Sequence, residues 1–155
     1  MSKEQVLAEL KSKLGKEDQP TPWVEVDQER INRFADATGD HQWIHVDVER
    51  ARSESPYKAT IAHGFLTLSL LPFLTGAVSA GKPQYAGVKL GVNYGLNKVR
   101  FPAPVKAGSR IRTRSKVIDV SEVQGGLQFI REVTVDVEGS DKPCCVAETI
   151  SRLYF

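Results

Sequence analysis

One apolar segment, from Phe65 to Leu74, restricts the fold of this 155-residue chain more than any other. The run FLTLSLLPFL is apolar on nearly every side, whereas a helix at a protein surface carries a polar face. It is also much shorter than the roughly 20 residues that cross a bilayer. We therefore expect a helix buried inside a globular domain, with Pro72 producing a kink rather than a break.

The second half of the chain is rich in Val, Ile, Thr and aromatic residues between glycine- and proline-bearing turns, which is typical of antiparallel strands. The expected strands are Tyr85 to Phe101, Arg110 to Val120, Leu127 to Val137 and Cys144 to Phe155. In the third strand one face is apolar except for Arg131, as expected when that face packs on a core; its other members are Leu127, Phe129, Val133, Val135 and Val137.

The first half predicts two amphipathic helices. Ser2 and Gln5 make a capping box for the first helix, which continues to Gly15. Asp27 can cap the second, and Gly39 is its stop signal. The remaining segments are a short strand at 23–26 and a loop at 40–57 with one helical turn near 48–52.

This order of elements predicts an α+β fold in a single domain, residues 1–155. A meander of antiparallel strands can bury its apolar face by wrapping around the one buried helix, an arrangement called the hot dog. The 41% of hydrophobic residues is enough for one packed core.

The charges give no sign of a nucleic-acid partner, because 21 Lys and Arg stand against 19 Asp and Glu without a long block of one sign. Met1 to Lys16 is too charged for a signal peptide, so we expect a cytoplasmic protein with no membrane association. Cys144 and Cys145 are adjacent, and Cα atoms about 3.8 Å apart are too close for ordinary disulfide geometry. We interpret them as small buried residues, and they lack the spacing of zinc ligands.

The segment Asp40-His41-Gln42-Trp43-Ile44-His45 contains residue types suited to proton transfer. Asp40 and His45 can converge only if the chain between them turns, and Gly39 supplies conformational freedom at its start. The alternative is that Asp40 forms a turn and His45 is solvated. A metal site built from His41 and His45 would need helical spacing, which Gly39 and the polar composition disfavour.

Two further segments carry candidate substrate-binding residues. Gly64 begins the apolar helix, where a free backbone N–H can hold a polarised carbonyl oxygen, although Gly64 can equally serve a tight turn. His63 beside it is expected to be structural, with a hydrogen bond to a backbone carbonyl. In the strand from Asn93 to Pro102, Asn93 can reach the pocket and Lys98 and Arg100 can meet phosphates, or simply form a solvated face.

Together these segments resemble the MaoC-like dehydratases, a family that includes the (R)-specific enoyl-CoA hydratases, over nearly the whole chain. The residues that match the family in order and spacing are Phe34-Ala35-Asp36-Ala37-Thr38-Gly39-Asp40, His45, Ala62-His63-Gly64 and Phe101-Pro102-Ala103-Pro104-Val105. The run from Asn93 to Arg100 looks closest to a nodulation-protein-N-like branch. Gln42 and Trp43 stand where the usual signature has Asn and Pro, which affects loop shape and acyl preference rather than catalysis.

The resemblance implies a hot-dog homodimer that acts in fatty acid metabolism, adding water to trans-2-enoyl-CoA without a metal or redox cofactor. Coenzyme A is then part of the substrate. The family's catalytic Asp and His fall on Asp40 and His45, and its helix-start amide falls on Gly64. A hot-dog acyl-CoA thioesterase and a non-catalytic acyl-thioester binding subunit are the alternatives, since a fold does not determine a function.

Overall fold

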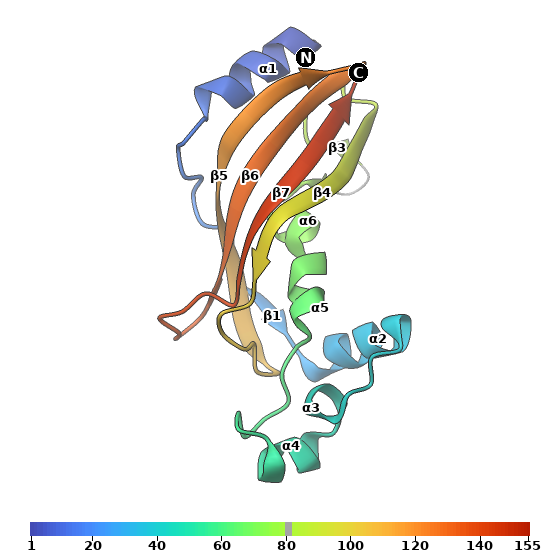
Figure 1. The fold of residues 1–155 in the computed structure, drawn as a ribbon, viewed down its shortest axis with the longest axis vertical. Coiled ribbons are helices and arrows are strands. Elements are labelled where there is room, and N and C mark those ends of the chain that lie inside the picture. Colours follow the sequence, from blue (N-terminus) through green and yellow to red (C-terminus); the bar gives the residue numbers. More distant parts are fainter. Residues whose placement is uncertain (80–81) are drawn as a thin grey trace.

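The computed structural model describes residues 1–79 and 82–155. A curved five-stranded antiparallel sheet in the order β1-β5-β6-β7-β4 wraps around a central helical segment (Figure 1). The elements are α1 (Lys3–Ser12), β1 (Val24–Val26), α2 (Gln28–Thr38), α3 (Trp43–Val46), α4 (Val48–Glu54), α5 (Gly64–Ser69), α6 (Leu71–Leu74), β2 (Val78–Ser79), β3 (Lys82–Pro83), β4 (Leu90–Arg100), β5 (Ser109–Val123), β6 (Gly126–Val137) and β7 (Cys145–Tyr154).

The strand order departs from the simple meander expected from the sequence. Strands β5, β6 and β7 do form consecutive antiparallel pairs, but β4 lies beside β7 at the edge of the sheet. The connection from β4 to β5 forms backbone hydrogen bonds with the chain that precedes α5. Ala62 N donates to Val105 O at 2.7 Å, and Ala107 N donates to Thr60 O at 2.9 Å. That segment therefore serves as a brace for the chain leading into α5 instead of a hairpin.

The predicted central helix is present but is divided in two. Its interruption lies at Leu70, whose amide donates to both Leu66 O and Thr67 O, rather than at Pro72. Leu66, Leu71 and Leu74 are buried. The expectation of burial on every side was wrong, because Phe65 is 68% exposed and Phe73 53% exposed. The sheet covers only one side of the helix.

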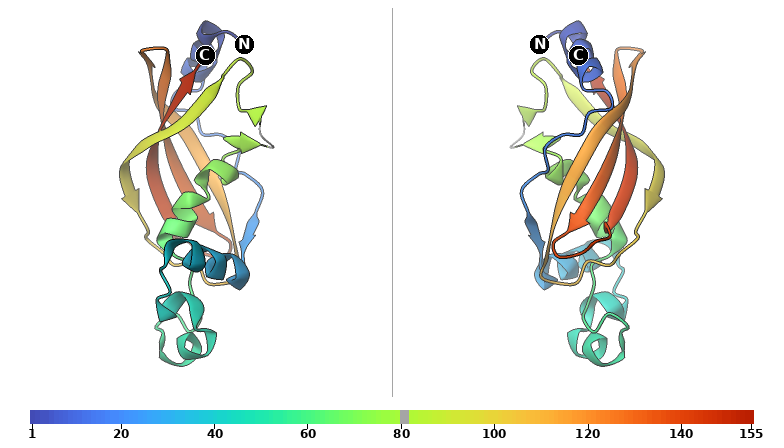
Figure 2. Two further views of the ribbon diagram at one scale, coloured as in Figure 1. Left: turned by 90° about the vertical axis from the view of Figure 1, so that its right-hand side faces the viewer. Right: turned by 90° about the vertical axis from the view of Figure 1, so that its left-hand side faces the viewer.

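The core lies on the concave face of the sheet, which Figure 2 shows curving around α5 and α6. Alternate residues of β6 are buried, including the apolar set predicted from the sequence and Arg131. At the other end of the sheet α1 covers a second cluster, in which Val6 and Leu10 are fully buried against Val117 and Leu127. The amino-terminal helix is therefore part of the hydrophobic core.

The caps expected at Ser2, Asp27 and Gly39 form, but the first helix ends at Ser12 instead of continuing to Gly15. Both bonds of the Ser2–Gln5 capping box form, Asp27 accepts from Arg30 N at 2.8 Å, and Gly39 ends α2 with φ of 79°. The helical turn expected near 48–52 is present as α4, which extends to Glu54, but the loop predicted for the rest of 40–57 was wrong in part because it also contains α3. In Figure 1 these helices lie below the sheet, near α2. Across the described residues, no helix is long and apolar enough to cross a membrane.

The burial of α1 gives a stability prediction. Leu10→Ala removes a fully buried side chain and should lower the free energy of unfolding by about 2–5 kcal/mol, through lost burial and a residual cavity. Leu14→Ala is the matched control, since Leu14 is 41% exposed and its loss should cost less than about 1 kcal/mol. Urea denaturation of both variants measures the difference. Equal losses would mean that α1 does not dock as described.

Candidate active site

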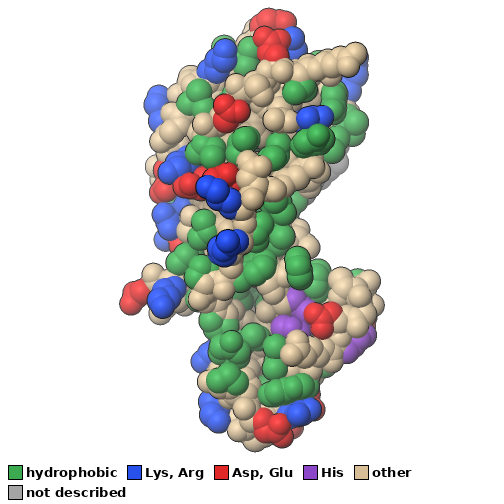
Figure 3. All heavy atoms as spheres, in the orientation of Figure 1, with side chains coloured by type: hydrophobic (Ala, Val, Ile, Leu, Met, Phe, Trp, Pro, Cys, Tyr) green, Lys and Arg blue, Asp and Glu red, His purple; other side chains and the backbone are tan. Residues whose placement is uncertain are grey.

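Asp40 and His45 converge at the lower end of the sheet. Gly39 turns the chain out of α2, and the single turn of α3 then carries His45 back toward Asp40. Polar side-chain atoms of Asp40, His45 and His63 all lie within 4.8 Å of one another. Figure 3 shows histidine side chains gathered beside an acidic one on this face. The convergence predicted from the sequence is therefore confirmed.

His45 is held in one tautomer by a backbone carbonyl. Its side chain is buried, and Nδ1 lies 2.7 Å from the carbonyl oxygen of Ile61. A carbonyl oxygen only accepts, so Nδ1 carries the proton and Nε2 has its lone pair free. Burial lowers the pKa of His45, against the opposing effect of the Ile61 carbonyl, and nearby His63 lowers it further. The environment favours a neutral imidazole that can accept a proton at Nε2.

His63 supports this pair from behind. Its Nε2 lies 2.9 Å from the backbone oxygen of Asp40, which confirms the structural role expected for this residue. Its ring stacks on that of His45 with centroids 3.8 Å apart and an interplanar angle of 25°. Phe34 covers it at a centroid distance of 4.9 Å. These contacts fix the main chain at Asp40, while the carboxylate itself stays half exposed and accessible.

Gln28, at the start of α2, is a positioning residue that the sequence analysis missed. Its Nε2 donates to the backbone oxygen of His45 at 2.7 Å, and its Oε1 accepts from the hydroxyl of Thr60. Gln28 therefore ties α3 to the chain before α5. No pattern in the sequence indicates this bond, because its partners are far away along the chain.

Gly64 is required for close packing rather than for an unusual turn. A Cβ atom at this position would lie 2.9 Å from the ring of Phe101, which is too close. Gly64 is also the first residue of α5, so its N–H has no acceptor within the helix. The amide is available to a ligand oxygen, and Phe101 limits the space beside it.

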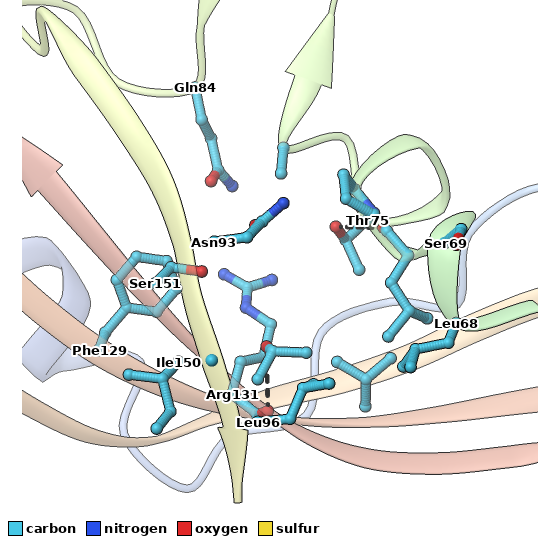
Figure 4. A pocket seen from close by; sticks show the side chains of 16 residues that line it. Leu68, Ser69, Thr75, Gln84, Asn93, Leu96, Phe129, Arg131, Ile150 and Ser151 are labelled. Carbon is cyan, nitrogen blue, oxygen red and sulfur yellow. Dashed lines mark hydrogen bonds between the residues drawn. The ribbon is translucent and has the colours of Figure 1, made fainter. Parts of the chain in front are cut away.

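A cavity of about 400 Å³ begins one helical turn beyond Gly64, at Leu68. It lies between the central helices and strands β4, β6 and β7 (Figure 4), and Asn93 contributes to its wall as predicted. Apolar side chains such as Leu71 and Val133 form much of the remaining wall. Asp40 and His45 do not line the cavity, but α5 runs from their neighbourhood to it.

The other candidates lie apart from this site. Lys98 is largely exposed and lies 3.8 Å from Glu148, and Arg100 Nη1 donates to the carbonyl of Val99. Neither lines the cavity. His41 is exposed, pairs with Asp36 at 2.9 Å and does not belong to the group formed by Asp40, His45 and His63, so the His41–His45 metal site is not formed.

The two adjacent cysteines are buried, as predicted from the sequence. Both are free, and burial raises the pKa of Cys144 to about 12 and that of Cys145 to about 11. Trp43, at the unusual position in the loop, begins α3 and lies under the guanidinium of Arg50 at 4.3 Å. This contact joins α3 to α4.

The sequence of this chain matches a known family model and two named relatives. The model of the MaoC-like domain matches residues 9–139. The chain is 53% identical to 3-hydroxyacyl-thioester dehydratase Z of Mycobacterium tuberculosis, covering 94% of each chain. It is 45% identical to nodulation protein N of Rhizobium leguminosarum, covering 96% of this chain and 91% of the relative.

Solved structures agree on the fold. The monoamine oxidase regulatory protein of Archaeoglobus superposes with a TM-score of 0.75 at 22% identity, covering 91% of this chain and 90% of that one. The (R)-hydratase of A. caviae superposes with a TM-score of 0.66 at 19% identity, covering 89% and 94%. At these identities the likeness concerns the fold, which is the predicted hot dog.

The buried His45 predicts a pH-dependent stability. A pKa below the ordinary value of about 6.5 means that the unfolded chain binds a proton before the folded one as the pH falls. The stabilisation is full above about pH 6.5 and is lost as the pH falls toward the folded pKa. Urea denaturation at pH 7.5 and pH 5 should show wild type losing more stability than His45→Gln. Parallel losses in the two proteins would contradict a neutral, buried His45.

Proposed function

Since this chain belongs to the MaoC-like dehydratase family, we propose that it is a hydro-lyase acting on coenzyme A thioesters. In this proposal it adds water to trans-2-enoyl-CoA and, in reverse, dehydrates the (R)-3-hydroxyacyl-CoA. The observation that carries the proposal is the closeness of Asp40 to a His45 whose Nδ1 is held by the Ile61 carbonyl, beside the start of α5. The 53% identity to a 3-hydroxyacyl-thioester dehydratase supports it.

The proposed mechanism assigns one role to each polar group. The Gly64 amide binds the thioester oxygen and stabilises the negative charge that develops there. Nε2 of His45 takes a proton from a water molecule as the oxygen of that water bonds to C3. That proton passes from His45 to the Asp40 carboxylate, which then delivers it to C2. Both residues thereby return to their starting forms, and dehydration follows the same steps in reverse.

The same proposal assigns the rest of the substrate. The acyl chain enters the cavity beside Leu68, where Asn93 contributes a polar contact. Lys98 and Arg100, both exposed on β4, meet the phosphates of coenzyme A. Only water and protons are exchanged in this reaction, so it needs neither a metal nor a redox cofactor.

The experiment that tests this proposal follows two signals from one trans-2-enoyl-CoA. Hydration should remove the absorbance of the conjugated enoyl group while a thiol reagent detects no free coenzyme A. The product should react with a dehydrogenase selective for (R)-3-hydroxyacyl-CoA. Release of free thiol at the rate of substrate loss would instead identify a thioesterase. No change in either signal across several chain lengths would favour a non-catalytic binding subunit.

Variants of the pair make the test specific. Asp40→Asn and His45→Gln keep the side-chain shape but remove a proton carrier, so each should lower kcat by about 100-fold or more. His41→Gln is the matched control, because His41 lies in the same segment but is exposed and bonded to Asp36. Circular dichroism checks that each variant is folded. Near-normal kcat in either pair variant would exclude the assigned residue.

We also propose a homodimer. Every residue of the edge strand β4 is at least partly exposed, and an unpaired edge of this length is normally covered in a stable protein. Leu90, Tyr94 and Leu96 are among its exposed side chains, and Phe65 is exposed as well. Light scattering should therefore give about twice the 17.1 kDa of one chain. A monomer at working concentrations would contradict this assignment.

A further inference from the structure

Arg131 is the single charged residue among those that line the cavity in the described part of the chain. It lies on the inward face of β6, between Phe129 and Val133, and only 9% of its surface is exposed. A buried guanidinium is costly unless its charge and its donors are satisfied. Its position in an otherwise apolar row therefore requires a partner.

The protein satisfies this guanidinium only in part. Nη1 donates to Oδ2 of Asp18 at 3.2 Å and to the hydroxyl of Ser115 at 3.3 Å. Within residues 1–79 and 82–155, Nε and Nη2 make no side-chain hydrogen bond to the protein. The carboxylate of Asp18 is 41% exposed and does not line the cavity. Two donors on one edge of the guanidinium are thus left for another group.

Other polar groups surround those donors. Figure 4 shows the guanidinium of Arg131 beside Asn93 and Ser151, with the amide of Gln84 above them. In the same view Leu68 lies to the right of the guanidinium and Leu96 below it. The cavity therefore combines an apolar wall with a cluster of neutral donors around one cation, and no carboxylate lines it within the described residues.

We propose that Arg131, together with Asn93 and Ser151, binds a carboxylate at the far end of the acyl chain. Parallel N–H groups on Nε and Nη2 match the two oxygens of a carboxylate, which a methyl-ended chain cannot offer. This assignment rests on the proposed function and names its substrate class as ω-carboxyacyl thioesters. Arg131 is then a specificity-determining residue that takes no part in the proton transfers.

The helix sets how far the chain must extend. At 1.5 Å per residue, Leu68 lies about 6 Å along α5 from Gly64, and the cavity continues from there past Leu71 of α6 to Thr75. A thioester whose oxygen is held at Gly64 can therefore reach Arg131 only with a tail that continues well beyond the reacting carbons. Short acyl groups should not be affected by Arg131.

The kinetic test compares two trans-2-enoyl-CoA substrates of equal chain length, one ending in a methyl group and the other in a carboxylate. Arg131→Met should lower kcat/KM for the carboxylate substrate by about 10- to 100-fold, mainly through KM, and should leave the methyl-ended substrate unchanged or improved. Asp18→Asn removes the negative charge that partly neutralises the guanidinium and should shift the preference toward the carboxylate substrate. Arg110→Met, which removes an exposed cation paired with Glu138, controls for net charge.

A binding test separates this inference from the proposed reaction. Calorimetry with saturated acyl-CoA and ω-carboxyacyl-CoA of equal length should show tighter binding of the latter to wild type and loss of that difference in Arg131→Met. Should Arg131→Met fail to fold, Arg131→Lys keeps the charge without the fork and should lose most of the preference. Equal binding of the two ligands would overturn the carboxylate site while leaving the hydratase proposal standing. If neither thioester binds, both proposals fail, whereas Arg131-dependent binding without hydration would overturn the reaction alone.

Discussion

The hydrogen bond from His45 Nδ1 to the carbonyl of Ile61 joins the two segments on which the site depends. At the same residue the amide of Ile61 donates to Ile44 O at 3.0 Å, so the α3 turn and the chain leading into α5 are bonded in both directions. One consequence is chemical, since the bond leaves Nε2 free as a proton acceptor. The other is geometric, because it places the first amide of α5 beside the pair.

Much of this arrangement could be predicted from local sequence. The caps at Ser2, Asp27 and Gly39 depend on neighbouring residues, and the buried face of β6 follows from strict alternation. The placement of β4 beside β7 could not be predicted, because it depends on backbone pairing between residues distant along the chain, from Leu90 with Tyr154 to Arg100 with Val146. The Gln28–His45 bond is equally long-range and leaves no periodic signal.

The two apolar surfaces of the chain are used differently. Among the described residues, apolar side chains on the concave face of the sheet form a main core around α5 and α6. A second cluster lies beneath α1. Phe65 and Phe73 lie on the uncovered side of the same apolar segment and are exposed. The segment therefore lacks a polar face even on the side that the sheet does not cover. Arg131 breaks the apolar row of β6 at the cavity wall, where a polar group has space to meet a ligand.

In the proposed reaction Asp40 and His45, which one short segment carries, act on the same face of the substrate. Hydration of a trans-2-enoyl-CoA in D2O tests this directly, because the deuterium at C2 and the oxygen at C3 record the faces on which they were added. Proton NMR of the product should show the single diastereomer produced by syn addition. The anti diastereomer, or a mixture of the two, would contradict the account, since it would require a proton donor on the opposite face.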